Sequence, residues 1–364
     1  MLEYIRKGGE AFMNIDYVGV DYHTKFAVAT RMNRDGNIIS TDKIDNTKED
    51  IRGYLSTLPS GTKVALESTG NWYAFVEWAH DLPLDIVLSH PQKTRVIAES
   101  RIKTDTINSK VLADLLRTNY LPQSYLAPAD VRDIRELIRF RTTIVRMKAL
   151  FETKIYNAVY KNGEKIMATR SDGRKARAEI AKMNLRPVYQ DEINSCLAIC
   201  DYFKTQIKQY DEEVERKATM DDDCKLLMTI PGISFFGALL ITSELGDWRR
   251  FASSRKLASY AGLVPSTYSS GGRTRHGAIT KQGSKNLRFI LLQAITHLAR
   301  RDARFGKMYT RIKIKHGAKT ARIAVSRKLL CVIFAMLRSR QPFQITKDRQ
   351  HLKAAQSVPT KRRE

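Results

Sequence analysis

The sequence predicts a mixed α/β sheet followed by a long, mainly helical region. Residues 17–44 read as short strands joined by tight turns, and residues 46–97 then alternate between helical and strand patterns. Two uninterrupted helical patterns follow, over 131–160 and 189–218. Beyond residue 221 the periodic segments are helical. We therefore expect an α/β domain, a helical arm and a helical carboxy-terminal domain.

The amino-terminal elements are placed by alternation of apolar residues and by turn signals. Asp35-Gly36 is a strong two-residue hairpin signal. Strand-type alternation occurs in five segments: 17–22, 26–30, 37–44, 63–66 and 85–88. Helical patterns lie between or after them, over 46–58, over 72–80 and from residue 91. This order favours one mixed sheet within an amino-terminal domain over 1–127.

Residues 128–220 are expected to form a helical arm. Two long helices joined by a loop are typical of a dimerisation coiled coil, or of a pair that packs back on its own chain, and both alternatives stay open. The polar, basic stretch 161–187 contains Gly163 and Gly173 and ends at Pro187, which predicts a loop or a poorly ordered insertion.

The carboxy-terminal domain is expected over 221–340. A Pro231-Gly232 turn joins two helical patterns, as in a helix-hairpin-helix that holds a DNA phosphate, and equally as in an ordinary helical hairpin. Three further helices are expected, over 251–261, 285–299 and 318–338. The basic tail 341–364 is expected to be disordered.

Bulk composition limits the location of the protein. No run of about 18 uncharged apolar residues is present, so no transmembrane span is expected. The first residues do not fit a secretory signal. The four cysteines, at 196, 200, 224 and 331, suit neither zinc nor a disulfide framework and predict buried thiols in a reducing compartment. We therefore expect a cytoplasmic protein.

The positive charge is concentrated in the last third of the chain. From Arg249 to the end, 28 Lys and Arg face three acids, whereas residues 1–248 carry 35 of each sign. A surface of this sign and size attracts polyanions, of which nucleic acid is the usual one.

The stretch 264–285 combines serines, glycines and cations. Ser269 and Ser270 precede Gly271-Gly272, and paired glycines let a backbone approach a ligand closely. A hydroxyl among cations can meet a phosphate, although a solvated surface turn is the plain alternative. The cations expected to bind nucleic acid here are Arg273, Arg275, His276, Lys281, Lys285 and Arg288.

Three acids stand at the ends of predicted elements. Asp21 and Glu67 each end a predicted strand, and Asp105 begins a helical stretch. Carboxylates gathered at such ends can hold Mg²⁺, and two ions about 4 Å apart can support an in-line phosphoryl displacement. Unrelated surface acids would give the same pattern.

Taken in order, these segments resemble a known family. VGVD at 18–21, LESTG at 66–70, KTDTIN at 103–108 and YSSGG at 268–272 resemble the DEDD-type insertion-sequence transposases, a group that includes the Piv pilin-gene invertase and bridge-RNA-guided serine recombinases. The resemblance spans nearly the whole chain. It implies a RuvC/RNase H-like domain, a coiled-coil arm and a carboxy-terminal transposase domain.

The resemblance also implies an activity. Asp21, Glu67 and Asp105 would be metal ligands for Mg²⁺, with two ions expected, and Ser270 would be the nucleophile. The enzyme would cut and rejoin donor and target DNA, guided by a structured RNA encoded by the element. Homodimers would assemble into a homotetramer.

One position departs from the family pattern. The fourth acid falls three residues after the third, and this chain has Asn108 there. Positions 105 and 108 share a helix face, so Asn108 still points toward the site with a neutral oxygen. Asp114 lies about half a turn away around the helix and does not replace it. Weaker metal binding and slow or absent catalysis are therefore expected.

Three other interpretations stay open at this point. His297 and Arg300 form an HxxR pattern with Tyr309 after it, as in tyrosine recombinases, although that class uses no carboxylate site. A RuvC-like nuclease would use water and leave Ser270 without a role. A nucleic-acid-binding protein that has lost catalysis would be consistent with Asn108. The target sequence, the guide RNA sequence and the host cannot be deduced.

Overall fold

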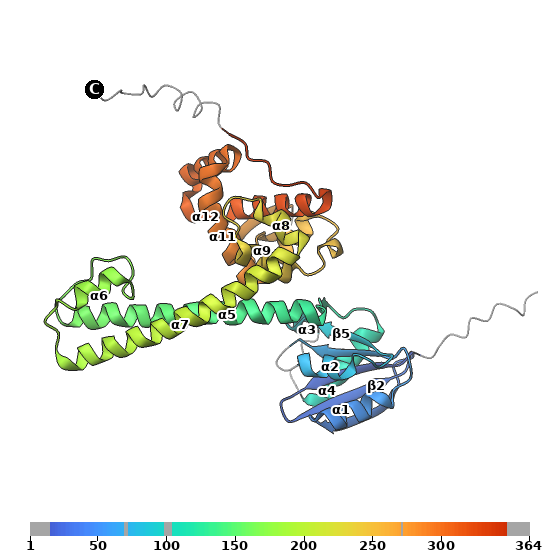
Figure 1. Cartoon of the computed structure of the whole chain (residues 1–364). Helices are drawn as coiled ribbons and strands as arrows, with labels where there is room; N and C mark the ends of the chain where they lie inside the picture. The colour runs from blue at the N-terminus through green and yellow to red at the C-terminus, as the bar shows by residue number, and fades with distance from the viewer. Residues whose placement is uncertain (1–14, 69–71, 98–103, 271, 348–364) are drawn as a thin grey trace, which may run out of the picture. The chain divides into compact units, whose positions relative to one another are not determined.

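The computed structural model describes residues 15–68, 72–97, 104–270 and 272–347. The chain divides into two compact units, Met1–Leu126 and Ala127–Glu364 (Figure 1). Among the described residues, no helix combines the length and apolar character needed to cross a bilayer.

The first unit is built on a six-stranded mixed sheet. Its strands are β1 (Tyr17–Tyr22), β2 (Phe26–Met32), β3 (Ile38–Asp45), β4 (Lys63–Glu67), β5 (Asp85–Ser89) and β6 (Gln123–Ser124), in the order β3-β2-β1-β4-β5-β6. β1 is antiparallel to β2 and parallel to β4, and β5 is parallel to β4. The mixed sheet predicted from the sequence is confirmed, and it fits an RNase H-like fold; the short edge strand β6 was not predicted.

Helices cover both faces of this sheet. They are α1 (Lys48–Ser56), α2 (Trp72–Ala79), α3 (Pro91–Ile97) and α4 (Asp105–Arg117). Because side chains alternate along a strand, Val18 and Val20 of β1 join the core with α1 and α2, while Ala65 of β4 packs with Leu112 of α4. The sheet therefore has two buried faces, which explains why β1 and β4 read as near-continuous apolar runs.

A single glycine sets the distance between α4 and β1. A Cβ built on Gly19 would lie 2.0 Å from the Ser109 carbonyl oxygen and 2.4 Å from the Ala113 nitrogen, so only glycine allows this approach. The buried hydroxyls of Thr30 and Ser109, 2.7 Å apart, fix the same contact from β2. The amino-terminal end of α4 is thereby held beside the carboxyl end of β1.

The arm consists of two long antiparallel helices, α5 (Ala129–Lys161) and α7 (Pro187–Met220). Arg141 pairs with Asp211 and the Cys200 thiol lies against the Lys148 carbonyl, so the pairing runs in opposite directions along the two helices. Pro187 begins α7 at a position where its missing N–H is harmless. The two helices form a pair within one chain, while the arm as a domain over 128–220 and its role as a coiled coil stay predictions.

The insertion between the two arm helices contains a short helix, where a loop or a poorly ordered insertion was expected. It contains α6 (Arg174–Ile180), whose Ala176 and Ile180 are buried against the arm in a small apolar core. The fully buried Asp172 carboxylate pairs with Lys148 at 2.5 Å and with Lys204 at 3.2 Å. The polar composition of 161–187 concealed these buried contacts.

The rest of the second unit surrounds the largest apolar core, which buries side chains of α8, α9, α11 and α12. Its elements are α8 (Asp222–Met228), α9 (Phe235–Leu245), the short 3₁₀ helix η1 (Trp248–Arg250), α10 (Ser254–Tyr260), β7 (Pro265–Ser270), β8 (Arg273–Ile279), α11 (Lys285–Arg301) and α12 (Ala303–Ser339). Gly232, in the turn before α9, packs against Ala294 and His297 of α11. The helix-hairpin-helix interpretation of α8 and α9 stays a prediction.

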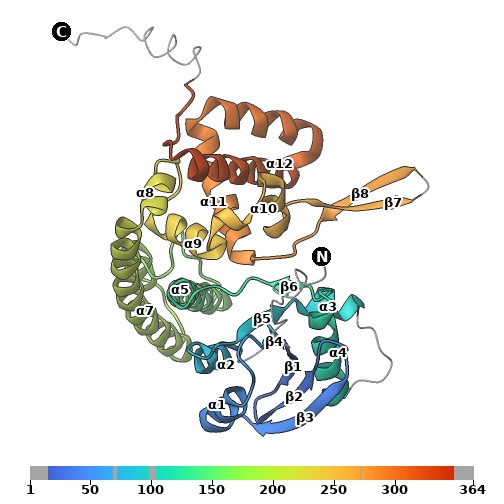
Figure 2. The ribbon, with the colours of Figure 1, turned by 90° about the vertical axis from the view of Figure 1, so that its right-hand side faces the viewer.

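The serine stretch is a β-hairpin, where a loop was expected. β7 and β8 are antiparallel, with Ser270 paired to Arg273 across Gly271-Gly272 (Figure 2). Gly272 has a φ of +76°, which glycine adopts without strain and which two-residue hairpin turns require. The Gly-Gly pair itself was the available signal for this hairpin, since paired glycines are common in two-residue hairpin turns.

The end of the chain also differs from expectation. α12 is a helical hairpin that reverses at Gly317, so helix begins at Ala303 and well before residue 318. Residues 341–347, expected to be disordered, are held by hydrogen bonds from the Phe343 amide to Thr229 Oγ1 and from the Thr346 amide to Asp302. Residues 348–364 lie outside the described residues.

Candidate active site

The carboxyl end of β1 carries Asp21, the first predicted metal ligand. Its neighbour Val20 pairs with Leu66 in the parallel strand β4, so the ends of β1 and β4 lie side by side. The Asp21 carboxylate is 11% exposed, which is enough for a small ligand to reach a group otherwise enclosed by protein. A carboxylate at this edge of the sheet is the position that the sequence predicted.

The first turn of α4 brings two further predicted residues to Asp21. Thr104 caps this helix by accepting the Ile107 amide, and Asp105 and Asn108 follow at a spacing of three residues. Asn108 Nδ2 donates a hydrogen bond of 2.9 Å to Asp21 Oδ2. Asn108 thus faces the site, as expected, and it acts there as a hydrogen-bond donor to Asp21.

His23 completes the group and was missed in the sequence. Its Nε2 lies 3.5 Å from Asp21 Oδ1 and 3.3 Å from Asp105 Oδ1. This nitrogen is buried without a hydrogen-bond partner among the described residues. His23 lies directly after β1, so the alternation along the strand gave no signal for it, and only its closeness in sequence to Asp21 could have pointed to it.

Glu67 lies at the end of β4, paired in register with Ser89 of β5. The last pair between β1 and β4 joins Val20 to Leu66. Asp21 and Glu67 each follow this pair by one residue, so their backbones lie at the same edge of the sheet. The close group of potential ligand atoms among the described residues contains Asp21, His23 and Asp105, without Glu67. A role for Glu67 as a ligand stays a prediction.

The donor group fits a divalent cation. One atom from each of Asp21, His23 and Asp105 lies within 4.8 Å of the other two. Adjacent ligands of an octahedral ion with bonds of about 2.1 Å lie about 3 Å apart, which is close to the observed 3.3 and 3.5 Å. Two carboxylates and one imidazole are ordinary ligands for divalent metals. The residues present thus suit a cation at the end of β1.

The predicted nucleophile lies in the second unit, at the tip of the β7–β8 hairpin. The backbone of Ser270 ends β7, and Ser269 precedes it, paired with Thr274. Tyr268, one residue earlier, is 72% exposed. Because the hairpin ends in a two-residue turn, either serine stands close to the outermost point of this ribbon.

The cations predicted to bind nucleic acid divide into two groups. Arg273, Arg275, Lys281 and Lys285 are exposed, along β8 and up to the start of α11. Arg288 is different, because its guanidinium donates to the carbonyl oxygens of Ala261 and Gly283, both at 3.1 Å, and burial lowers its pKa. These hydrogen bonds tie Arg288 to the segments that flank the hairpin, and its role as a nucleic-acid contact stays a prediction. For His276 only the backbone position in β8 is described.

Two family models match separate parts of the chain. Residues 18–159 match the model of DEDD transposases of IS110-type elements, described as "Transposase". Residues 224–310 match the model described as "Transposase IS116/IS110/IS902 family". The first range contains the group at the end of β1, and the second contains the β7–β8 hairpin.

Two curated transposases are similar over nearly the whole chain, and a third curated protein is similar over about a third of it. The chain is 23% identical to the transposase for insertion sequence element IS1328 of Yersinia enterocolitica, over 87% of this chain and 95% of that protein. It is 22% identical to the transposase for IS1111A of Coxiella burnetii, over 94% and 95%. It is 36% identical to the pilin gene-inverting protein of Moraxella bovis, over 32% and 38%.

Proposed function

Because the chain belongs to the IS110 family of DEDD transposases, we propose that it recombines donor and target DNA through a serine nucleophile and a carboxylate-held divalent cation. The observation that best supports this proposal is the convergence of Asp21 and Asp105 at one edge of an RNase H-like sheet. A serine hairpin of the second unit supplies the hydroxyl.

In this proposal Asp21 and Asp105 hold the cation, Glu67 contributes from β4, and His23 offers a nitrogen ligand. The bound cation, which we take to be Mg²⁺ and to be present as two ions, would stabilise charge on the attacking and leaving oxygens. Asn108 keeps Asp21 oriented through its 2.9 Å hydrogen bond. Because Asn108 is neutral, the site carries one negative charge fewer than a four-carboxylate site would.

The covalent chemistry belongs to Ser270. Its Oγ attacks a phosphorus of the DNA backbone and loses its proton to a base of the acidic site, and the deoxyribose hydroxyl of the cut strand leaves. The phosphoserine bond conserves the energy of the broken phosphodiester. A hydroxyl of the partner strand then attacks the same phosphorus and releases Ser270. The net result is strand exchange without loss of phosphodiester bonds.

The exposed cations of the hairpin would hold the nucleic acid backbone during this exchange. Arg273 and Arg275 alternate with Thr274 along β8, so both lie on the same face of the ribbon. We propose a structured guide RNA as a second partner beside DNA, because the last third of the chain carries all of the net charge of +25.

RNA dependence tests this proposal directly. Protein expressed with its own element should co-purify with a discrete structured RNA, and exchange between donor and target plasmids should require that RNA. Nuclease treatment followed by addition of the transcript should restore exchange. Exchange at full rate without RNA would contradict guidance while leaving the serine chemistry intact. Strand hydrolysis without rejoining would favour the nuclease alternative.

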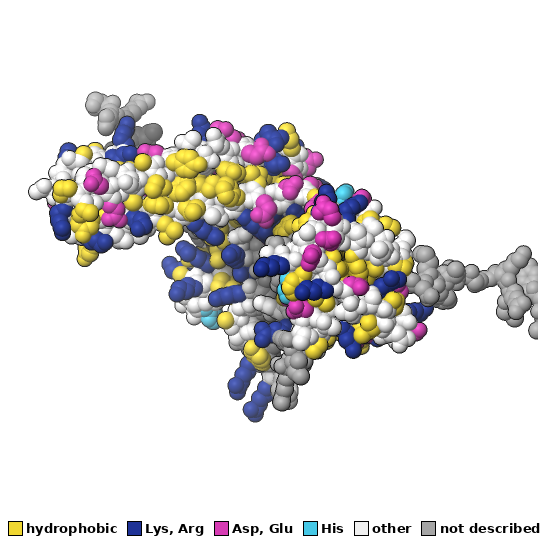
Figure 3. All heavy atoms as spheres, turned by 90° about the horizontal axis from the view of Figure 1, so that it is seen from below, with side chains coloured by type: hydrophobic (Ala, Val, Ile, Leu, Met, Phe, Trp, Pro, Cys, Tyr) yellow, Lys and Arg dark blue, Asp and Glu magenta, His cyan; other side chains and the backbone are white. Residues whose placement is uncertain are grey.

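The arm is proposed as the dimer interface of a tetrameric assembly. Phe140, Met147 and Leu150 of α5 and Tyr202 of α7 are between 46% and 65% exposed. Figure 3 shows hydrophobic side chains gathered on one face of the arm. An apolar face of this kind on a helix pair suits a second copy of the same arm.

Substitution of Asn108 is expected to raise the rate of strand cleavage, whereas most substitutions in an active site lower it. Asn108→Asp should raise the rate of strand cleavage at least tenfold, about 1.4 kcal/mol of barrier, because it adds an anionic oxygen donor. The Mg²⁺ concentration for half-maximal rate should fall. The measurement is single-turnover cleavage across a Mg²⁺ titration, with Asp114→Asn on the outer face of α4 as a control. A variant that cleaves no faster at any Mg²⁺ concentration would exclude position 108 from the site.

A further inference from the structure

The first half of α12 is a basic element that the proposed active site does not use. α12 contains ten Lys and Arg and no acid. Its second half is anchored in the core through Val325, Leu329 and Ile333, which are fully buried. Arg311 and residues 313–320 are exposed, so the turn of this helical hairpin projects beyond the core. We define residues 310–320 as the α12 tip.

The tip is built to reverse sharply and present side chains outward. Gly317 has φ +80° and ψ 165°, and a Cβ built there would meet nothing within 4 Å. The turn therefore lies in open space. Beside it, Ile314 is 80% exposed, the highest value among the large hydrophobic residues described. An exposed isoleucine among Lys313, Lys315 and His316 is not accounted for by packing within this unit.

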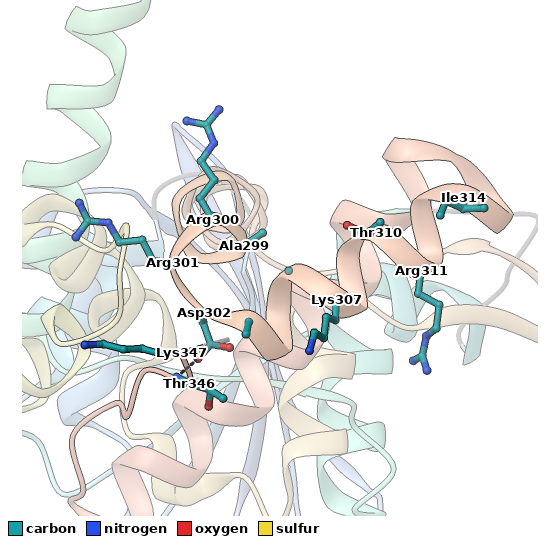
Figure 4. Close-up of a pocket in the computed structure, with 12 residues that line it drawn as sticks. Ala299, Arg300, Arg301, Asp302, Lys307, Thr310, Arg311, Ile314, Thr346 and Lys347 are labelled. Atoms are coloured by element: carbon teal, nitrogen blue, oxygen red, sulfur yellow. Dashed lines mark hydrogen bonds between the residues drawn. The ribbon is translucent and has the colours of Figure 1, made fainter. Parts of the chain in front are cut away.

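A cavity of about 790 Å³ lies at the base of the tip, between the end of α11 and the start of α12. Figure 4 shows Lys307 and Arg311 projecting from the same side of α12, while Arg300 and Arg301 extend from the end of α11. The carboxy-terminal segment forms another part of the lining with Lys347. Cations from three separate segments thus surround one hollow.

The acid in this cavity is already fully engaged. Asp302 is 1% exposed and accepts hydrogen bonds from the Phe305 amide, the Thr346 amide and Arg304. Burial alone would raise the pKa of the Asp302 carboxyl, but these hydrogen bonds lower that pKa below its ordinary value. Its role is to cap α12 and to hold the carboxy-terminal segment. The cavity therefore presents a net positive lining to an anion.

We propose that the α12 tip and this cavity form a second duplex-DNA contact, separate from the serine hairpin. Arg301, Lys307 and Arg311 would bind phosphates in and beside the cavity, and the lysines of the tip would follow the backbone. Ile314 would press between bases in the minor groove and bend the duplex, as exposed apolar residues ringed by cations do in DNA-bending proteins. The choice of DNA over RNA as the ligand rests on the proposed function. The charge and geometry of the tip and the cavity do not depend on that proposal.

Removal of charge at the tip tests this contact in the full-length protein. Arg311→Gln, Lys313→Gln and Lys315→Gln together should weaken binding to a labelled DNA duplex about 10- to 100-fold and reduce the slope of log K against log salt by about 2–3. The matched control removes three exposed cations of the arm: Lys154→Gln, Lys165→Gln and Lys182→Gln. Binding is measured by fluorescence anisotropy in EDTA, so that the result does not depend on catalysis.

Ile314→Ala provides an independent second test. The variant should keep the wild-type salt slope and thermal midpoint but lose bending, measured by energy transfer between dyes at the two ends of the duplex. The proposal would be overturned if the triple variant of the α12 tip and the triple variant of the arm bound duplex DNA with equal affinity and an equal salt slope. Unchanged bending by Ile314→Ala, or a loss confined to duplex RNA, would also overturn it. Failure of the serine chemistry would appear only in strand exchange and leave these readouts unchanged.

Discussion

Ser270→Ala is expected to abolish strand exchange, lowering the rate at least about a thousandfold, because the proposed mechanism assigns the covalent bond to DNA to the Ser270 hydroxyl. Affinity for DNA and RNA should stay within about twofold, since one neutral hydroxyl adds little to the last third of the chain, which carries the whole net charge of +25. Exchange is measured between donor and target plasmids, and affinity by anisotropy on the same preparations.

Ser269→Ala is the matched control for this prediction. It removes the same hydroxyl one residue earlier on β7, where the backbone is paired with Thr274. Its exchange rate should remain within a few-fold of the wild type. If Ser270→Ala recombines at the wild-type rate, or if only Ser269→Ala loses activity, the assignment of the nucleophile is wrong.

Substitution of a site carboxylate should have an effect of similar size by a different route. Asp21→Asn, Glu67→Asn and Asp105→Asn should each lower cleavage about 100- to 1,000-fold, or 2.7–4 kcal/mol of barrier, because each removes an anionic ligand. Folding should not suffer, since Asp21→Asn keeps an oxygen that can accept the Asn108 amide and reduces repulsion between acids. The thermal midpoint without metal should be equal or slightly higher.

Ligand binding distinguishes this explanation from a structural one. Mg²⁺ at 100 times its dissociation constant should stabilise the wild type by about 2.7 kcal/mol and the three variants by much less. Asp114→Asn, an exposed acid on the same helix that pairs with Arg117 at 2.6 Å, should respond to Mg²⁺ like the wild type. A clear loss of metal-free stability in all three variants would show that these acids act in folding.

The fold was predictable where local patterns agree with long-range packing. The strands of the first unit alternate or read as apolar runs because both faces of the sheet are covered, and Asp35-Gly36 marks one hairpin. The β7–β8 hairpin escaped prediction because serines, threonines and charges fill both strands, so no apolar alternation revealed it. In α6 the apolar contacts are few and their partners lie on α5 and α7, which no local pattern encodes.

The candidate site was predictable in part for similar reasons. Asp21 and Asp105 were found because acids at element ends are visible in sequence, and their closeness depends on Gly19, whose meaning appears only when α4 packs on β1. His23 lies in a turn just after β1, and the strand pattern ends before it. The hydrogen bonds of Arg288 could not be predicted, because the sequence gives its charge but not the two carbonyl groups that lie beside it.

Detection of a covalent protein–DNA bond tests the central claim most directly. DNA with a labelled target site is incubated with the Asn108→Asp variant and divalent metal, then quenched with denaturant, and the trapped peptide is identified by mass spectrometry. The account predicts a phosphodiester link to the Oγ of Ser270, absent in Ser270→Ala and in Asp21→Asn. A link to Tyr309, or cleaved DNA with no attached peptide, would contradict it.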